Sequence, residues 1–148
     1  MTPLVAKEAT QTYDPKTDVG TPTTNSGRVT AIAVDPACSA TSCRVWVGAG
    51  DGGVWRTSDA LAAKRTWTPP GASLPTNAIG SLYYDAPRKT LYAGTGEPNG
   101  SGDSEAGLGL YRSTDGGATW SAVPGSLPVA TNRSISSIVI DPTTPRTM

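Results

Sequence analysis

The side chains best suited to chemistry lie in a long glycine-rich stretch, residues 94–109. This stretch carries three carboxylates, Glu97, Asp103 and Glu105. Two carboxylates facing one cleft can hydrolyse a glycosidic bond, one as an acid and the other as a base or nucleophile. Carboxylate oxygens also suit calcium, so Asp103 and Glu105 are candidate calcium ligands. The third alternative is a solvated acidic loop that does no chemistry.

Asp51 and Arg28 are two further candidate residues outside this stretch. Asp51 lies in a second glycine-rich loop, residues 48–53, where Asp51-Gly52 is also a common turn dipeptide. Arg28 suits bidentate pairing with a carboxylate of a ligand. The candidate ligand-binding residues are therefore Asp51, Glu97, Asp103, Glu105 and Arg28. Within this set, Asp51 and Glu97 are the candidate catalytic residues.

The composition excludes several functions. The chain has 148 residues, with 12 Lys and Arg against 12 Asp and Glu, and it contains no histidine. Balanced charge argues against nucleic acid as a partner. The missing imidazole removes Ser-His-Asp catalysis and histidine-bound zinc. No apolar stretch approaches the roughly 18 residues that a membrane-spanning helix needs, so no membrane span is predicted.

The chain has two cysteines, Cys38 and Cys43, in a Ser- and Thr-rich segment between two predicted strands. Such a pair can close a disulfide across a hairpin if the Cα atoms come within about 7 Å. A loop this short contributes less than the roughly 3 kcal/mol of a 15-residue loop. The alternative is two free thiols in a reducing compartment. We predict the disulfide, and with it a secreted or cell-surface location.

The elements that must position these residues repeat along the chain. Residues 29–36, 79–86 and 135–142 each alternate, become continuously apolar and stop at an Asp turn. This pattern predicts a strand buried on both faces. Three shorter strands follow in the first two repeats, which predicts an antiparallel meander. They are expected at residues 45–48, 53–57 and 67–68 in the first repeat and at residues 91–94, 109–113 and 120–121 in the second.

One such sheet cannot bury both of its faces alone, whereas stacking sheets around an axis buries them. We therefore predict an all-β fold, a β-propeller fragment of four-stranded antiparallel blades. The expected parts are an extended lead-in at residues 1–26, a first blade at 27–76, a second blade at 77–132, and the truncated first strand of a third blade at 133–148.

The segment Ser113–Trp120 resembles the Asp box, S-x-D-x-G-x-T-W, of bacterial neuraminidase repeats. These repeats occur in sialidases, xyloglucanase-type glycoside hydrolases and the sortilin family. The first repeat has a degenerate copy, Thr57-Ser58-Asp59 and then Thr66-Trp67, with three extra residues between. The resemblance covers residues 27–142. It implies structural roles for the motif residues, which are Ser113, Asp115, Gly117, Thr119 and Trp120.

In this motif the Asp115 carboxylate is expected to accept N–H bonds within its own turn. Trp120 is expected to pack between sheets. The alternative, a catalytic or calcium-binding Asp115, is disfavoured because the Asp box lies away from the active site in the resembling families. In those enzymes the active site is at the opposite end of the blades, where the loops between the second and third strands lie.

The resemblance also bears on two candidate residues. Asp51 is similar to a catalytic Asp that precedes a Gly-Gly pair in xyloglucanase-type enzymes, although one residue fewer separates it from the glycines. Arg28 is similar to the arginines that hold the substrate carboxylate in sialidases, although Val29-Thr30 stand where Ile-Pro is expected.

The resemblance implies a secreted or surface propeller module that binds a glycan or protein ligand. Its remaining blades would belong to a larger protein. The alternative function is a glycoside hydrolase, sialidase-like or xyloglucanase-like, that acts through carboxylates. A third is a structural module for protein interaction. No cofactor is expected other than the calcium considered above, and neither nucleic acid nor a membrane span is expected.

Overall fold

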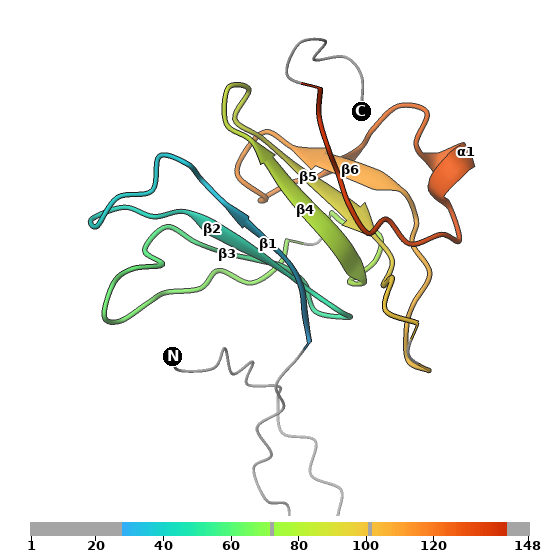
Figure 1. Cartoon of the computed structure of the whole chain (residues 1–148), viewed down its shortest axis with the longest axis horizontal. Coiled ribbons are helices and arrows are strands. Elements are labelled where there is room, and N and C mark those ends of the chain that lie inside the picture. Colours follow the sequence, from blue (N-terminus) through green and yellow to red (C-terminus); the bar gives the residue numbers. More distant parts are fainter. Residues whose placement is uncertain (1–27, 72, 101, 142–148) are drawn as a thin grey trace, which may run out of the picture.

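The computed structural model describes residues 28–71, 73–100 and 102–141, and strands dominate it (Figure 1). One sheet, the first sheet, has three strands, and the other, the second sheet, has four. The elements are β1 (Val29–Val34), β2 (Val45–Ala49), β3 (Gly53–Thr57), β4 (Ile79–Asp85), β5 (Thr90–Thr95), β6 (Leu110–Ser113), β7 (Ser121–Ala122) and the short helix α1 (Leu127–Ala130). The all-β prediction is confirmed. The expected lead-in at residues 1–26 lies outside the described residues, as does the end of the chain from residue 142.

Within each sheet, neighbouring strands follow one another along the chain and run antiparallel. Strand order therefore agrees with the predicted meander. Both first strands carry an irregularity at the same point, between Val29 and Ala31 in β1 and between Ile79 and Ser81 in β4. The two sheets thus repeat in local geometry as well as in sequence. None of the described residues forms a helix that is long and apolar enough to cross a membrane.

The fourth strand differs between the sheets. The second sheet has it as β7, whereas the first sheet has only an isolated bridge between Arg56 and Thr68. The Arg56 N–H donates to the Thr68 carbonyl at 3.1 Å, and the Thr68 N–H donates back at 2.8 Å. Pro69 and Pro70 follow at once and have no N–H, so the ladder cannot continue. The first sheet is therefore three-stranded rather than four-stranded as expected.

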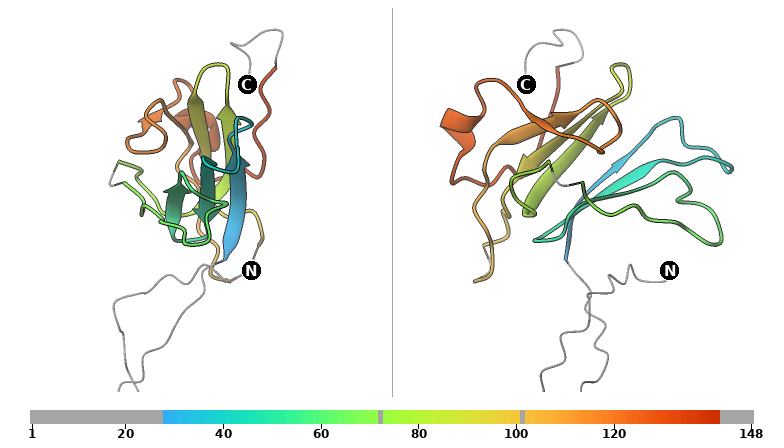
Figure 2. Two further views of the ribbon diagram at one scale, coloured as in Figure 1. Left: turned by 90° about the vertical axis from the view of Figure 1, so that its left-hand side faces the viewer. Right: turned by 180° about the vertical axis from the view of Figure 1, so that it is seen from behind.

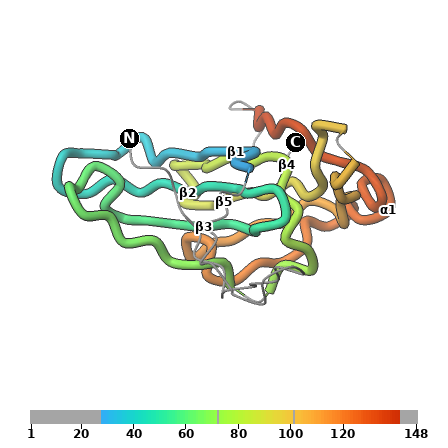
Figure 3. The backbone as a smooth tube through the Cα atoms, turned by 90° about the horizontal axis from the view of Figure 1, so that it is seen from below, coloured from blue at the N-terminus to red at the C-terminus, as the bar shows by residue number. Residues whose placement is uncertain are grey.

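The two sheets pack against each other with β1 beside β4 (Figures 1 and 2). Figure 3, seen from below, shows β1, β2 and β3 of the first sheet side by side in that order, with β4 and β5 of the second sheet next to them. The core between the two sheets contains Ala33, Trp46 and Val54 from the first sheet, and Ile79, Leu91, Ala93, Tyr111 and Trp120 from the second sheet and its β6–β7 turn. A smaller apolar cluster, Tyr92, Val123 and Ile140, gathers separately. Each sheet thus buries aromatic side chains, as the blade-like repeat predicts.

Residues 133–141 carry no helix or strand and pass beside β4 (Figure 1). The Ser81 hydroxyl donates to the Ile135 carbonyl at 2.8 Å, and the Ile135 N–H donates to the Thr95 carbonyl at 3.0 Å. A strand needs a hydrogen-bonded ladder with a neighbour, and these residues lack one within the described part of the chain. The strand expected from residue 135 is therefore not assigned.

Residues 133–141 nevertheless pack against the second sheet in the same way as β4 packs against the first sheet. A Cβ atom on Gly48 would lie 2.6 Å from Ile79 Cγ2, and one on Gly94 would lie 2.6 Å from Ile135 Cγ2. The Thr30 hydroxyl donates to the Ile79 carbonyl, as the Ser81 hydroxyl does to that of Ile135. In both places the glycine lies in the second strand of its sheet and has no side chain. An isoleucine further along the chain can therefore pack closely against that strand.

Candidate functional site

The start of β1 and the loop after β5 meet through an ion pair. Arg28 Nη2 lies 2.8 Å from Glu97 Oε1, although 69 residues separate the two in sequence. The Glu97 side chain is 1% exposed and that of Arg28 is 40% exposed. The hydrogen bond to the Glu97 carboxylate raises the pKa of Arg28. The structure thus brings together two of the five candidate ligand-binding residues, one directly before the first sheet and one in a loop of the second.

Gly50 leaves room for the Arg28–Glu97 ion pair because it has no side chain. A Cβ atom on Gly50 would lie 1.8 Å from Glu97 Oε1. The Gly50 N–H donates to the Arg28 carbonyl at 2.9 Å, which places the β2–β3 turn against the ion pair. Gly96, with φ of 86°, turns the chain into the loop. Glu97 therefore joins the two sheets.

Glu97 also closes the base of its own loop. Its N–H donates to the Glu105 carbonyl at 2.9 Å, and the Glu105 N–H donates to Glu97 Oε2 at 3.3 Å. The Ser134 hydroxyl donates to the Glu97 carbonyl at 3.0 Å. Both carboxylate oxygens of Glu97 thus accept a hydrogen bond inside the protein.

Asp103 is the third candidate residue at this place. Its Oδ1 lies 3.7 Å from Arg28 Nη2, and its side chain is 78% exposed. With its amide oxygen turned toward Arg28, Asn99 accepts from the Arg28 Nε at 3.0 Å. Arg28, Asn99 and Asp103 therefore form a polar cluster over the buried Glu97, and the tip of the loop presents it to solvent.

The other two candidates do not join this cluster through their side chains. Glu105 is exposed and meets Glu97 through its backbone. Asp51 is exposed in the β2–β3 turn with φ of 56°, which fits the Asp-Gly turn alternative. Among the described residues, no three His, Cys, Asp or Glu side chains are grouped so that they can hold a metal ion. The calcium site suggested for Asp103 and Glu105 thus gains no support from the geometry.

The opposite end of the second sheet carries the turn of residues 113–120, which resembles an Asp box in sequence and is called the Asp-box turn for that resemblance. Asp115 Oδ1 accepts from the Ser113 hydroxyl at 2.7 Å and from the N–H groups of Ala118 and Thr119, both at 2.9 Å. Asp115 Oδ2 accepts from the Thr119 hydroxyl at 2.6 Å, and the Gly117 N–H donates to the Ser113 hydroxyl at 2.7 Å. These hydrogen bonds, of which those from Thr119 have the largest effect, hold the pKa of Asp115 well below its ordinary value. The carboxylate locks the turn.

The same turn is docked on the first sheet. Trp120 is buried in the core between the sheets. The Gly116 carbonyl accepts from Trp46 Nε1 at 2.8 Å. The Trp120 N–H donates to the Ser73 hydroxyl at 2.9 Å, in the link between the sheets. The motif thus fixes the second sheet against the first.

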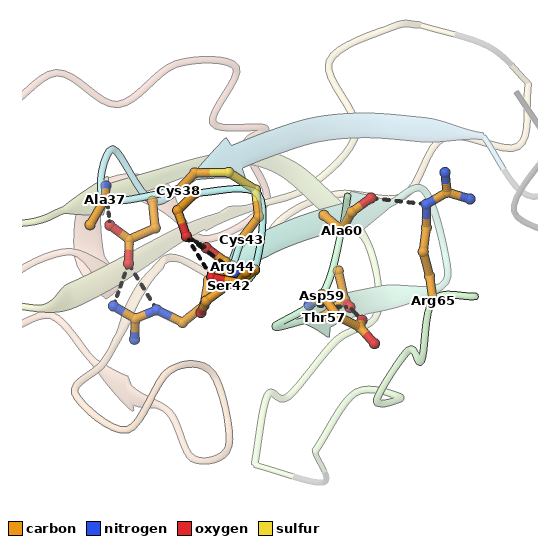
Figure 4. The surroundings of a disulfide bond; sticks show 12 residues. Ala37, Cys38, Ser42, Cys43, Arg44, Thr57, Asp59, Ala60 and Arg65 are labelled. Carbon is orange, nitrogen blue, oxygen red and sulfur yellow. Dashed lines mark hydrogen bonds and ion pairs between the residues drawn. A yellow bond between two sulfur atoms is a disulfide. The ribbon is translucent and has the colours of Figure 1, made fainter. Parts of the chain in front are cut away.

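The degenerate copy in the first sheet keeps the central bonds of the motif. The Thr57 hydroxyl donates to Asp59 Oδ1 (Figure 4). The Thr66 N–H donates to the same oxygen at 3.2 Å. The hydrogen bond from the Thr57 hydroxyl is the main cause that lowers the pKa of Asp59. The three inserted residues therefore lengthen the turn without removing its carboxylate lock.

The predicted disulfide between Cys38 and Cys43 is confirmed, with Cα atoms 4.2 Å apart. It closes the hairpin between β1 and β2 (Figure 4). Cys43 is buried, and its backbone bonds both to Ser58, at 2.9 Å, and to Ala60, at 3.1 Å. The disulfide hairpin and the degenerate turn therefore support each other at one end of the first sheet.

Sequence analysis missed two arginines at this end, Arg44 and Arg56. Both line a hollow between the first sheet and the Asp-box turn. The only signal for Arg56 was its recurrence, because Arg112 occupies the same place in the third strand of the second sheet. For Arg44 the sequence offered no signal.

Comparisons of the chain with models of protein families, with curated proteins and with solved structures each return no match. The function is therefore inferred from the two ends of the repeated sheets. One end has the polar cluster over Glu97, and the other has the turns locked by Asp59 and Asp115.

Proposed function

We propose that this chain supplies two repeats of a β-propeller of the Asp-box type, and that its loop end binds a glycan or protein ligand. The observation that carries the propeller is the repeated contact between sheets. Ile79 lies on Gly48 as Ile135 lies on Gly94. Successive repeats that pack against one another through the same contact stack around an axis.

Exposed apolar side chains support further units in a larger protein. On β1, Val29, Ile32 and Val34 are 46%, 61% and 51% exposed. Val139, in the segment after α1, is 76% exposed. Apolar surface of this kind on a soluble protein commonly marks an interface. The remaining blades are the partners that the proposal assigns to these surfaces.

The disulfide supports a secreted or cell-surface location. Disulfides persist in oxidising compartments and are rare in reducing ones. The Cys38–Cys43 bond closes a hairpin with a buried member, Cys43, which favours a structural role over a redox role.

Ligand binding at the loop end is supported by a fixed loop with an exposed polar tip. Glu97 anchors the base of the loop, whereas Asn99 and Asp103 are exposed. Gly50 touches Glu97, so the turn that carries Asp51 lies at the same end. Loops held by a rigid scaffold commonly carry binding residues. Amide, carboxylate and guanidinium groups together suit a hydroxyl-rich glycan or a polar protein surface.

Hydrolysis of glycans has less support than binding. A catalytic carboxyl must come within hydrogen-bond reach of the substrate atom that it protonates or attacks. The Glu97 side chain is 1% exposed, and its two oxygens accept from Arg28 and from the Glu105 N–H. Among the candidate catalytic residues this leaves Asp51, in an exposed turn, without the second carboxylate that the reaction needs.

The test is binding of the chain to an array of neutral and acidic polysaccharides and to a panel of extracellular proteins. Binding that Asp103→Ala weakens and Lys64→Ala leaves unchanged supports the proposal. Lys64 is an exposed residue in the longer turn of the first sheet and serves as the matched control. Equal binding by the two variants contradicts the loop end as the site. Release of reducing sugar from a bound polysaccharide would instead support the alternative function, hydrolysis of the glycan.

A further inference from the structure

The end of the sheets opposite to the polar cluster holds a hollow of about 250 Å³. It lies between the first sheet and the Asp-box turn of the second. Its lining residues are Arg44, Trp46, Arg56, Thr57, Ser58, Thr68, Asp115 and Gly116. Two guanidinium groups and several hydroxyls therefore border one small space.

The pairing of the strands explains how these groups come together. Trp46 of β2 is directly opposite Arg56 of β3, and Arg56 is opposite Thr68. Residues opposite each other in adjacent strands share a face of the sheet, so these three form one row. Arg44 lies two residues before Trp46, on the same face, and its guanidinium is 5.7 Å from a Trp46 ring centroid.

The carboxylate that lines this space, Asp115, and the one paired with Arg44, Asp35, already have partners. Arg44 Nε donates to Asp35 Oδ2 at 2.8 Å, which balances the charge of Arg44. Both oxygens of Asp115 accept hydrogen bonds from the turn that it locks. Neither carboxylate has an oxygen within 4.0 Å of an Arg56 nitrogen, so Arg56 makes no direct ion pair within the described residues.

Arg56 is the remaining charge, and it is half-buried. Within the described residues its guanidinium makes one long hydrogen bond, from Nη1 to the Gly116 carbonyl at 3.5 Å, and has no carboxylate within 4.0 Å. A guanidinium carries five N–H donors. Partial burial of a cation without a counter-ion is unfavourable. The hollow beside Arg56 thus has the charge and the donors that an anion requires.

We propose that this hollow binds an oxyanion, a carboxylate or sulfate group, with Arg56 as its main donor. The guanidinium fork matches the geometry of such groups, and the Ser58 and Thr68 hydroxyls add donors of suitable size. The volume is below the roughly 300–1,000 Å³ of drug-sized sites, which fits inorganic sulfate or one acidic sugar. The site is independent of the polar cluster at the loop end, so the two proposals succeed or fail separately.

The repeat supplies a matched control. Arg112 holds in the second sheet the place that Arg56 holds in the first, since it is opposite Tyr92 in β5 and Ser121 in β7. Arg112 is exposed, and it is absent from the lining of the hollow. Arg112→Ala therefore removes the equivalent charge without touching the proposed site.

The test is a nuclear magnetic resonance titration of the whole chain with sodium sulfate, with glucuronate and with glucose, at constant ionic strength. The reporter is the indole N–H of Trp46, because it donates to Gly116 at the edge of the hollow. We expect a saturable shift with sulfate or glucuronate and none with glucose. Arg56→Ala should weaken the affinity at least tenfold, whereas Arg112→Ala should leave it unchanged.

The arms also separate the two sources of the anion. Saturation by sulfate alone assigns the site to an inorganic anion, and saturation by glucuronate alone assigns it to an acidic sugar. Shifts that do not saturate, equal binding of glucose, or equal affinity in Arg56→Ala overturn the proposal. If Arg56→Ala does not fold, Thr68→Val and Ser58→Ala remove hydroxyls from the same hollow, and unchanged affinity in both overturns it too.

Discussion

The carboxylate of Glu97 lies directly over Gly50, so close that a Cβ atom on Gly50 would come within 1.8 Å of Glu97 Oε1. The contact joins the β2–β3 turn of the first sheet to the loop after β5 in the second. A side chain at residue 50 would displace the Glu97 carboxylate, which is buried and paired with Arg28. The approach of the two sheets at the loop end therefore depends on this pair.

Gly50→Ala should destabilise the chain by about 1–3 kcal/mol, because the added methyl group displaces a buried carboxylate from its ion pair. Urea denaturation measures the change. Gly102→Ala is the control, since a Cβ atom there meets nothing within 4 Å. If Glu97→Ala is made first, Gly50→Ala should cost much less, as expected for two residues in contact. Equal costs in both backgrounds contradict the contact.

Arg28→Gln should loosen the loop at residues 97–105. The substitution removes the cation from a buried carboxylate, so Glu97 no longer holds the Glu105 N–H in place. We expect faster hydrogen exchange of the Glu105 amide and a lower melting temperature. Arg133→Gln, at an exposed arginine, should change neither. Unaltered exchange at Glu105 in Arg28→Gln is the contrary result.

Sequence predicted the parts of the fold that depend on short-range patterns. The Asp-box turn was predictable because Ser113, Asp115 and Thr119 bond to one another within seven residues. The disulfide was predictable for the same reason. The missing fourth strand of the first sheet was not anticipated, although Pro69 and Pro70 carried the signal, because the repeat at Trp67-Thr68 outweighed them.

The role of Glu97 was not predictable from the sequence. Its acid type and glycine-rich surroundings suit catalysis, contact with a ligand or ion, and a solvated loop alike in kind, and do not point to burial. Its burial depends on Arg28 and Gly50, which lie far away along the chain. Such contacts arise from the packing of the two sheets, and local composition does not encode them. For Asp103, whose side chain stays exposed, the array experiment tests the ligand-binding prediction.

Asp115→Asn should make the chain less stable at neutral pH, by about 1–2 kcal/mol given that the carboxylate is exposed. Because the folded state depresses the pKa of Asp115, its stabilisation is present above the ordinary carboxyl value of 3.8 and is lost as the pH falls below it. The difference in unfolding free energy between wild type and variant should therefore shrink below about pH 4. Urea denaturation from pH 7 to pH 2.5 measures it.

Asp51→Asn is the control for this pH series, since it removes one charge from an exposed turn at the other end of the sheets. It should have little effect on stability at any pH, because asparagine also tolerates the positive φ of residue 51. A difference between wild type and Asp115→Asn that stays constant with pH would mean that the lock does not depend on the charge of the carboxylate.

Reduction of the Cys38–Cys43 bond should lower stability by about 2 kcal/mol at most, since the closed loop is short and restricts the unfolded chain little. The double variant Cys38→Ala, Cys43→Ala should match the reduced wild type, because Cys43 is buried and alanine also suits that place. Thermal unfolding with and without dithiothreitol measures the change. The variant should not respond to dithiothreitol at all. A wild type that is equally stable in both conditions contradicts a stabilising role for the disulfide. The hydrogen bonds from the Cys43 N–H to Ser58 and from the Ala60 N–H to Cys43 would then hold this end of the first sheet.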